Sequence, residues 1–399
     1  MTDASRAAGL ARLNAFLPRA GLAYARDRNR DLPGHHAVSG LSPYIRHRLV
    51  LESEVADAAL ATHGAQEAEK FLSEVYWRTY WKGWLELRPR IWQDYKQGLQ
   101  AALNRTATES GLRKEWQAAC EGRTGIDGFD HWAQELVDTG YLHNHARMWF
   151  ASIWIFTLRL PWELGADFFL RHLLDGDPAS NTLSWRWVGG LHTPGKTYLA
   201  TAENIAKNTN RRFAPAGLAT QTFPLRAPAP PAAGPAPIGD DWPRSENIAL
   251  LLHEDDLDAG WLLARINPVA TALAACPADR SPLTVAPQVT AFTAAALADA
   301  ATRLPANAST FMGGDLVGDL HKWALKSGAD SVLSPYAPTG PMADVLANLA
   351  KKLAADGITL TRALRPYDAA LWPHATHGFF RFREAIGRTD DRQTTMVFG

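Results

Sequence analysis

The sequence predicts an α + α/β fold, in which an all-helical domain precedes a smaller, Rossmann-like parallel α/β domain. Before residue 213, apolar residues recur at three- and four-residue spacing, as in amphipathic helices. Residues 214–246 are rich in Pro and Ala without a helical or strand period, which is typical of a linker. After it, short apolar runs alternate with helical patterns, which indicates βαβ units. We therefore expect three parts: residues 1–213, 214–246 and 247–399.

The helical period is clearest in three segments of the first part. They are Phe71–Trp84, Asp130–Asp138 and His145–Arg159. In the first segment, Trp77, Trp81 and Trp84 stand at positions i, i+4 and i+7, so a helix places them on one face. Glycine and proline separate the helical stretches.

The last part shows five candidate strands and one clear helix. The strands are Asn247–Leu252, Leu283–Ala286, Ser309–Met312, Ser331–Ser334 and Ile358–Thr361. The helix is Met342–Ala355, and Gly357 just past its end suits a C-cap. We expect a five-stranded parallel sheet docked on the helical domain. It contains neither GxGxxG nor GxxxxGK[ST], so it is no standard dinucleotide or P-loop site.

Composition excludes several classes of protein. The 399 residues carry 41 Lys+Arg and 41 Asp+Glu, and a net charge of zero argues against a strongly basic nucleic-acid binder. No run of 18 apolar residues predicts a membrane span. Cys120 and Cys276 cannot by themselves ligate an iron–sulfur cluster or a four-cysteine zinc site, so we expect no metal. We expect a cytoplasmic monomer that does not bind membranes.

Tryptophan is the one residue type whose number is unusual. There are 15, most of them before residue 190, and each needs a packed site and a partner for its indole N–H. This concentration indicates aromatic stacking or aromatic chemistry in the first part.

Five motifs in the first part occur in a characteristic order. They are SGLSPY (39–44), FLSEVYWRTY (71–80), WQAACEGRTGIDGFD (116–130), TGYLHNHARM (139–148) and DGDPASNTLSWRW (175–187). Together they resemble the FAD-binding helical domain of the photolyase/cryptochrome family, from about Tyr24 to Asn208. The resemblance implies FAD as the cofactor.

The resemblance assigns ten residues to cofactor binding. They are Tyr24, Ser39, Gly40, Leu41, Ser42, Arg78, Arg147, Asp175, Asp177 and Asn181. The SGLS turn also suits an anion site from the residues alone, because it opens a helix. Its serines would equally suit helix capping, and both roles are compatible. The family's usual Thr before the first Ser is Val38 here, so one phosphate-binding hydroxyl is missing.

Four of these residues correspond to the family's contacts with the flavin ring. By the resemblance, Arg147 and Asp175 form the pair against the ring, Asp177 approaches its N3–O2 edge and Asn181 faces N5. A fixed guanidinium there would favour a reduced, anionic flavin. The alternative for Arg147 and Asp175 is an ordinary buried ion pair.

A second set of residues matches the family's pocket for damaged DNA. It contains Glu74, Trp77, Asn144, Met148 and Trp187. The resemblance implies that a flipped cyclobutane pyrimidine dimer is held there and split by an electron from reduced FAD. His145 departs from the family's Arg at that position, which weakens this interpretation. The alternative is a cryptochrome-like photoreceptor or flavin redox protein without repair activity.

Electron supply and DNA contact complete the expectations for the first part. Trp185 and Trp162 match the first two members of the family's tryptophan chain, whereas no Trp stands near the distal position, Thr106–Glu109. Surplus indoles that could substitute are Trp116, Trp132, Trp149 and Trp154. Candidates for a phosphate-contacting rim on damaged DNA are Arg26, Arg28, Arg30, Lys82, Arg88 and Arg90.

The last part resembles the same family in a different order. LLLHEDDLDAG (250–260) and Met312–His374 are similar to the antenna-type α/β domain, which normally precedes the FAD domain. This resemblance implies a permuted domain order and an antenna chromophore whose identity stays open. The alternative is an unrelated Rossmann-like domain.

Overall fold

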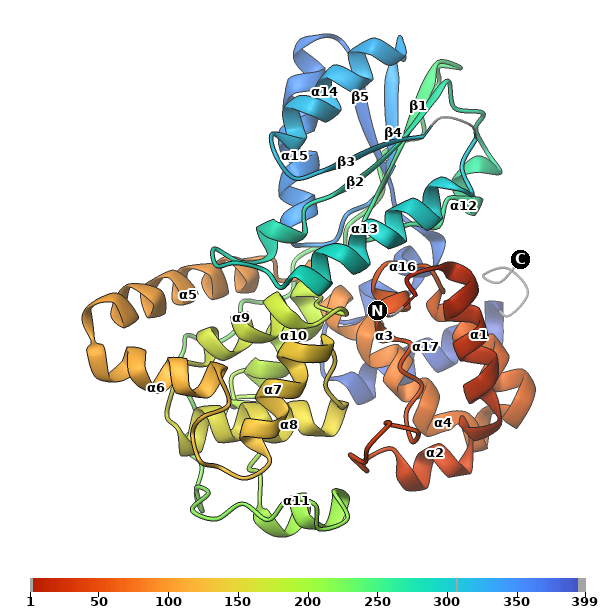
Figure 1. The fold of residues 1–399 in the computed structure, drawn as a ribbon. Coiled ribbons are helices and arrows are strands. Elements are labelled where there is room, and N and C mark those ends of the chain that lie inside the picture. Colours follow the sequence, from red (N-terminus) through yellow and green to blue (C-terminus); the bar gives the residue numbers. More distant parts are fainter. Residues whose placement is uncertain (1–2, 306–307, 394–399) are drawn as a thin grey trace.

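The computed structural model describes residues 3–305 and 308–393. It shows a helical region beneath a parallel sheet that is flanked by helices (Figure 1). The α + α/β class predicted from the sequence is confirmed. No helix in the described ranges is long and apolar enough to cross a membrane.

The helical region runs from residue 6 to residue 208. Its elements are α1 (Arg6–Phe16), η1 (Leu17–Arg19), α2 (Leu22–Asp27), α3 (Ser42–Arg46), α4 (Glu52–Glu86), α5 (Arg90–Thr108), α6 (Ser110–Cys120), α7 (Phe129–Thr139), α8 (Asn144–Ser152), η2 (Ile153–Thr157), α9 (Trp162–His172), α10 (Pro178–Val188) and α11 (Ala202–Asn208). The predicted helix Phe71–Trp84 is the second half of α4, whose axis breaks at Gly64, where φ is +70°. Helix α7 agrees with the prediction within one residue at each end, and the segment predicted as His145–Arg159 divides into α8 and the π-helical turn η2.

The sheet follows a crossover without helix or strand at residues 214–246. Its elements are β1 (Ile248–His253), α12 (Gly260–Leu263), β2 (Ala270–Ala275), η3 (Pro277–Arg280), α13 (Pro287–Ala301), β3 (Ser309–Met312), α14 (Leu316–Ser327), β4 (Ser331–Pro335), α15 (Pro341–Ala355) and β5 (Thr359–Ala363). The strand order is β3-β2-β1-β4-β5 and every pairing is parallel. The order reverses at β1, as in doubly wound folds.

One predicted strand was wrong. Leu283–Ala286 is a connection between η3 and α13, bounded by Pro282 and Pro287, and the Ala286 N–H donates to the Arg171 carbonyl of the helical region. The strand that was missed is β2, with the sequence ATALAA. Alanine has a low strand propensity. However, β2 lies between β1 and β3, and in such a central strand burial and close packing determine the conformation more than propensity does.

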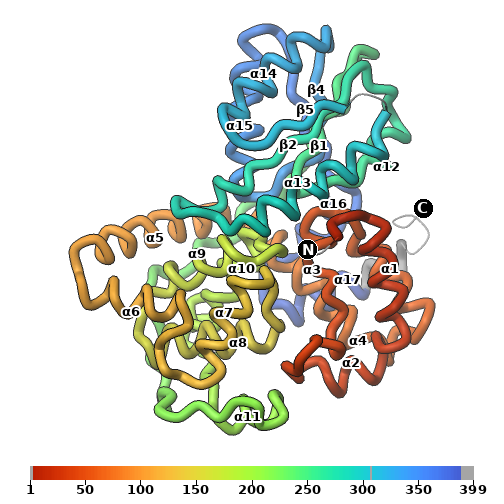
Figure 2. Tube along the Cα trace, viewed as in Figure 1, coloured from red at the N-terminus to blue at the C-terminus, as the bar shows by residue number. Residues whose placement is uncertain are grey.

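The two faces of the sheet belong to different cores. Alternate residues of β1 separate them: Leu250 and Leu252 pack in the core shared with α13 and the helical region, while Ala249 and Leu251 pack in the core with α14 and α15. Figures 1 and 2 show α13 between the sheet and the helical region. The sheet is therefore fixed on the helical region through a continuous apolar core.

The chain returns to the helical region after β5. Helix α16 (Pro366–Leu371), η4 (Trp372–His374) and α17 (Phe379–Gln393) all contact α4. Trp372 is buried, and its backbone lies so close to Gly83 of α4 that a side-chain carbon there would come within 2.9 Å of the Trp372 Cα. The predicted division of the chain into domains at residues 213 and 247 stays a prediction. The C-terminal helices bear on it most directly, because they follow the sheet in sequence but pack on α4 of the helical region.

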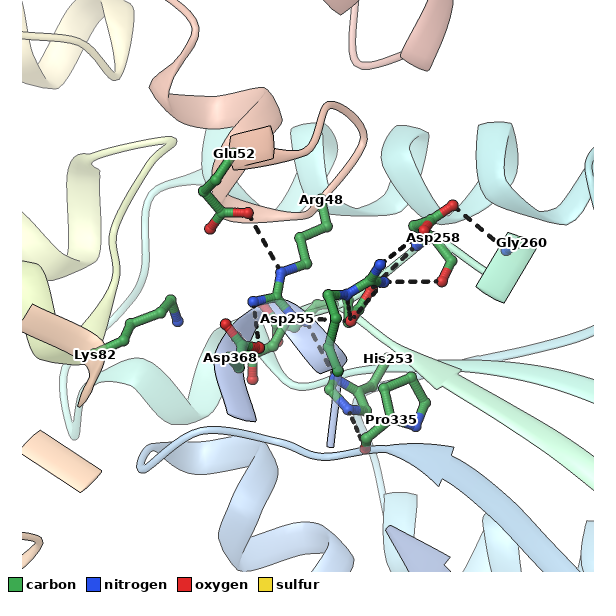
Figure 3. Close-up of polar contacts among 12 residues, drawn as sticks. Arg48, Glu52, Lys82, His253, Asp255, Asp258, Gly260, Pro335 and Asp368 are labelled. Atoms are coloured by element: carbon green, nitrogen blue, oxygen red, sulfur yellow. Dashed lines mark hydrogen bonds and ion pairs between the residues drawn. The ribbon is translucent and has the colours of Figure 1, made fainter. Parts of the chain in front are cut away.

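A buried cluster of charges joins the two regions at the carboxyl end of β1 (Figure 3). Arg48, which follows α3, lies 2.9 Å from Asp256 and 2.6 Å from Asp368. Arg46 pairs with Asp255, and Arg280 lies 2.8 Å from Glu254. In doubly wound folds this edge commonly binds a ligand, but here arginines of the helical region occupy it.

Candidate functional site

A cavity of about 460 Å³ lies among α2, α4, α8 and α10. Twelve residues predicted from the sequence line it: Tyr24, Glu74, Trp77, Arg78, Asn144, Arg147, Met148, Asp175, Asp177, Asn181, Trp185 and Trp187. They come from segments between 24 and 187 in the chain, so the fold gathers separate motifs around one space. Trp162 and the four residues Ser39–Ser42 are not part of this lining.

Helix α10 begins inside the DGD motif. The Asp177 side chain accepts from the Ser180 N–H at 2.8 Å as the N-cap, and Pro178 follows at the first helical position. Asn181 and Trp185 then stand four residues apart, which puts both on the face that lines the cavity. The aspartate thus fixes the direction from which α10 enters the site.

The pair of Arg147 and Asp175 forms as the resemblance implied. The Arg147 Nη2 donates to Asp175 Oδ2 at 3.0 Å, and its Nε donates to the Leu142 carbonyl at 2.9 Å. Asp175 Oδ1 is buried and has no hydrogen-bond partner among the described residues. One oxygen of the pair is therefore left for a ligand.

Asp177 lies in a group of cations. Lys82 Nζ is 2.8 Å and Arg78 Nη2 is 3.6 Å from its Oδ2. Burial would raise the pKa of Asp177, but the charges of Lys82, Arg78 and Arg46 hold it well below its usual range. The carboxylate therefore stays charged, and it holds two cations of α4 beside the cavity.

Asn181 has a defined orientation. Its Nδ2 donates to the Ala166 carbonyl at 2.7 Å, and the residue is buried. The donor side of the amide is thereby engaged by α9. Its carbonyl oxygen remains to accept a hydrogen bond.

Glu74 and Trp77 both have partners that the sequence did not indicate. Arg28, which directly follows α2, makes a hydrogen-bonded ion pair with Glu74. Burial raises the pKa of Glu74, and the charge of Arg28 opposes that shift. Trp77 is stacked on Phe379 of α17, with ring centroids 3.8 Å apart and an interplanar angle of 8°. The C-terminal helix thus covers one face of this indole.

The two tryptophans of the predicted electron route have different aromatic neighbours. Trp185 lies 6.1 Å from Trp154 between ring centroids, whereas Trp162 lies 5.8 Å from Tyr95. Over the described ranges, no ring contact joins Trp185 to Trp162, although Arg186 lies 6.0 Å over the Trp162 ring. The step from Trp185 to Trp162 stays a prediction, and Trp154 is a second acceptor to test.

The SGLS turn lies next to the cavity but not in its lining. Val38 lines the cavity, and the turn follows it directly. The Leu41 N–H donates to Ser39 Oγ at 3.3 Å, and Leu41 is the N-cap of α3, without a side-chain cap. The serines therefore do not cap α3 by their side chains, and their role toward phosphate remains a prediction.

The prediction that Lys82 and Arg88 belong to a DNA-contacting rim was wrong. Lys82 is buried against Asp177. Arg88 is buried too, and it donates to the carbonyls of Pro231 and Thr376. Helix α4 and its C-terminal end pack under the crossover and the C-terminal helices, contacts that the sequence did not reveal. These two side chains are unavailable to a DNA backbone.

His145 stands where the family has Arg, and it does not replace the positive charge of that Arg. It is buried, 3.3 Å from the Tyr198 hydroxyl, and packs against Trp149. Burial lowers its pKa to about 4, so the imidazole is neutral at pH 7.

The lining suits the cofactor that the resemblance implies. Besides Asp175 Oδ1, Ser180 Oγ and Trp185 Nε1 are buried without a hydrogen-bond partner in the part of the chain that the structure covers. Buried polar groups are normally paired, so these atoms point to a ligand with both donors and acceptors. Arg28, Arg78 and Arg147 add positive charge suited to a pyrophosphate. No cluster of His, Cys, Asp or Glu fit to hold a metal ion occurs in residues 3–305 and 308–393.

Comparison with known proteins agrees with this lining. Residues 71–218 match the family model of the FAD binding domain of DNA photolyase. The deoxyribodipyrimidine photo-lyase of Thermus thermophilus is 34% identical over 204 residues, which cover 48% of this chain and 44% of that protein. The one of Vibrio cholerae is 28% identical over 205 residues, covering 47% and 40%.

Solved structures match a similar share of the chain. A class III photolyase from Agrobacterium tumefaciens aligns with a TM-score of 0.44 and 26% identity, covering 52% of this chain and 43% of that one. The chain spans less than half the length of the curated relatives named above. Through residues 71–218 this chain is similar to the FAD binding domain of DNA photolyase, and its helical region is thereby similar to the photolyase/cryptochrome family.

Proposed function

We propose that this protein is a blue-light-driven DNA repair flavoprotein that splits cyclobutane pyrimidine dimers. The observation that carries the proposal is that one cavity gathers both predicted sets of residues, those for the flavin ring and those for the lesion. The curated relatives are named as photo-lyases of deoxyribodipyrimidines, which supports the same reaction. The α/β region is then an antenna-type domain in permuted order, and damaged DNA is the partner. A cytoplasmic, monomeric state remains part of this prediction.

The residues of the cavity have distinct tasks in this proposal. FAD, when bound and reduced, supplies a light-absorbing ring that donates one electron to the dimer and takes it back. Arg147 places a positive charge beside the ring and is itself held by Asp175 and the Leu142 carbonyl. Asn181 would accept a hydrogen bond from a ring N–H through its carbonyl oxygen, because its amide nitrogen donates to the Ala166 carbonyl. Arg78 contributes charge toward the phosphates.

The lesion would be held by side chains of α4, α8 and α10. Glu74 accepts from the pyrimidine edges, Trp77 and Trp187 provide aromatic surfaces, and Asn144 and Met148 complete the pocket. A flipped base gains from stacking on an indole. Phe379 covers one face of Trp77 and Trp81 lies 5.0 Å away between ring centroids, so the dimer would stack on the part of the indole that lines the cavity.

Three observations favour the second candidate, a photoreceptor or redox flavoprotein without repair. His145 is neutral and buried, Lys82 and Arg88 are withdrawn from the surface, and Glu74 is already paired with Arg28. DNA affinity depends strongly on phosphate contacts, and these features leave fewer cations for them. The deciding measurement is repair itself.

Removing the carboxylate of Glu74 tests repair. Glu74→Ala should weaken binding of a dimer-containing oligonucleotide by about 10- to 100-fold, the range for losing a hydrogen bond to a charged group. The measurement is light-driven restoration of pyrimidines in single-stranded DNA by the reduced protein, against a dark control. Glu69→Gln on the exposed face of the same helix is the matched control and should change nothing. Absence of restoration in the wild type, with FAD fully reduced, would favour the photoreceptor.

The cofactor site has its own test. Asp175→Ala and Arg147→Ala should each lower the FAD content of the purified protein, because each leaves the other charge unpaired beside the ring. Absorbance at the flavin band relative to protein gives the ratio. Full FAD content in both variants would contradict the assigned site.

Photoreduction tests the electron route. Trp185→Phe should strongly slow flavin reduction under blue light with an external thiol, while FAD stays bound. Comparing Trp162→Phe with Trp154→Phe then identifies the second step, since the former should slow the reaction and the latter should not. The opposite result would assign the step to Trp154, which lies 6.1 Å from Trp185.

A further inference from the structure

A second cavity, of about 1160 Å³, lies beside Trp162 and shares no lining residue with the flavin-type cavity. Helix α5, residues 155–163 and the crossover residues 223–231 form most of its wall, and Arg186 of α10 adds to it. Its volume exceeds the usual range for small-molecule sites, about 300–1,000 Å³. It is therefore large enough for a nucleotide-sized ligand.

The lining of this cavity is basic in a chain without net charge. It contains five arginines, Arg90, Arg105, Arg159, Arg186 and Arg226, against the two carboxylates Asp94 and Glu163. Arg90 lies 2.7 Å from Asp94, and Arg105 lies 2.8 Å from Glu109, which is outside the lining. Three arginines remain, Arg159, Arg186 and Arg226, and none of their side chains has an ion pair or hydrogen bond among the described residues.

Arg186 is the arginine of this cavity that most clearly lacks a partner. It is 4% exposed, and its buried Nε has no hydrogen-bond partner in the structure as described. Its one ring contact is with Trp162, 6.0 Å from the guanidinium to the ring centroid. Burial lowers the pKa of Arg186 against the opposing charges of Asp94 and Glu163. A buried guanidinium without a counter-ion is costly, so a protein that keeps one usually presents it to an anion.

Two further features of the cavity wall suit a ligand with a planar ring. Aromatic side chains share the wall with the arginines: Trp162, Phe156 and Phe223. Phe223 is 68% exposed, so its ring is accessible to a ligand in this cavity. Arg159 has a left-handed backbone, with φ of +55°, and such strain at a non-glycine residue is concentrated at binding sites.

We propose that this cavity binds a planar heteroaromatic ligand that carries a phosphate group, of the flavin or nicotinamide nucleotide kind. The ring would lie against Trp162, Phe156 and Phe223, and the phosphate would pair with Arg159, Arg186 and Arg226. Guanidinium groups recognise phosphate through paired hydrogen bonds, and aromatic faces favour a planar ring. The ligand would touch the indole that the sequence predicts as the second electron relay, on the side where the distal Trp is missing.

Isothermal titration of the purified protein with FMN and with NADH tests the proposal and requires neither light nor repair activity. At least one nucleotide should bind saturably, and riboflavin, which lacks the phosphate, should bind at least about tenfold more weakly than FMN. Arg186→Met should weaken nucleotide binding by about 10- to 100-fold. Comparing FMN with NADH shows whether the cavity prefers a flavin or a nicotinamide nucleotide.

The variants also separate a ligand role from a structural one. Arg226→Gln changes an exposed side chain and should weaken binding without affecting folding, whereas Arg123→Gln, at an exposed pair outside both cavities, should leave it unchanged. If neither nucleotide binds saturably to the wild type, the proposal is wrong. Equal affinities in the wild type, Arg186→Met and Arg226→Gln would also overturn it.

Discussion

Replacing Arg48 with methionine should lower the free energy of unfolding by about 3–5 kcal/mol, the range for removing one partner of a buried ion pair. Arg48 lies 2.9 Å from Asp256, 2.6 Å from Asp368 and 3.7 Å from Glu52, and all four groups are buried. Asp256 keeps Arg365, 2.7 Å away, but Asp368 loses the only cation within ion-pair distance in the described chain. Methionine keeps an unbranched apolar stem but has no guanidinium, so the loss reports the charge of Arg48 together with its hydrogen bonds to Asp256 and Asp368.

Urea denaturation of the two proteins measures this effect. The matched control is Arg362→Met, which removes an exposed pair with Asp240 at 2.9 Å between the crossover and β5. Exposed pairs contribute about 0–1 kcal/mol, so this variant should stay close to the wild type. A loss below about 1 kcal/mol in Arg48→Met would contradict the assigned role of the junction.

The ion pairs of this junction could not be predicted from the sequence. The HEDD sequence after the first strand was visible, but its partners Arg46 and Arg48 stand about 200 residues earlier, and no local period connects the two. The same holds for Phe379, which stacks on Trp77 from 302 residues away. Long-range pairs of this kind depend on how whole elements dock.

Local patterns were more informative. The motifs around Glu74, Arg147 and Asp175 correctly indicated residues that the fold brings into one cavity, because each motif sits on a helix or at a helix start whose direction the local sequence determines. Lys82 was misassigned to the surface since its helical position alone does not reveal the buried Asp177 beside it. The wrong strand prediction has a similar origin. Strand propensity favoured LTVA (283–286), whereas the strand in the structure is the alanine-rich segment Ala270–Ala275, which burial within the sheet stabilises.

Neutralising Asp177 should have an effect that depends on pH. At pH 7, Asp177→Asn should be less stable than the wild type by about 3–5 kcal/mol, because Lys82, Arg78 and Arg46 then face an uncharged amide in a buried site. Asparagine is as good an N-cap as aspartate and has the same shape, so α10 should still begin at this residue. FAD content should fall with stability, since the cations lose the group that holds them beside the cavity.

The sign of the pH dependence follows from the depressed pKa of Asp177. A carboxyl whose pKa is lower in the folded than in the unfolded state contributes fully above the unfolded value, about 3.9, and loses that contribution as the pH falls toward the folded value. The gap in stability between the wild type and Asp177→Asn should therefore be constant from pH 7 to about pH 5 and shrink below about pH 4. Urea denaturation at several pH values measures it, with Asp344→Asn, which removes an exposed pair with Lys96, as the control. A gap that stays the same down to about pH 3 would show that the charge of Asp177 is not its source.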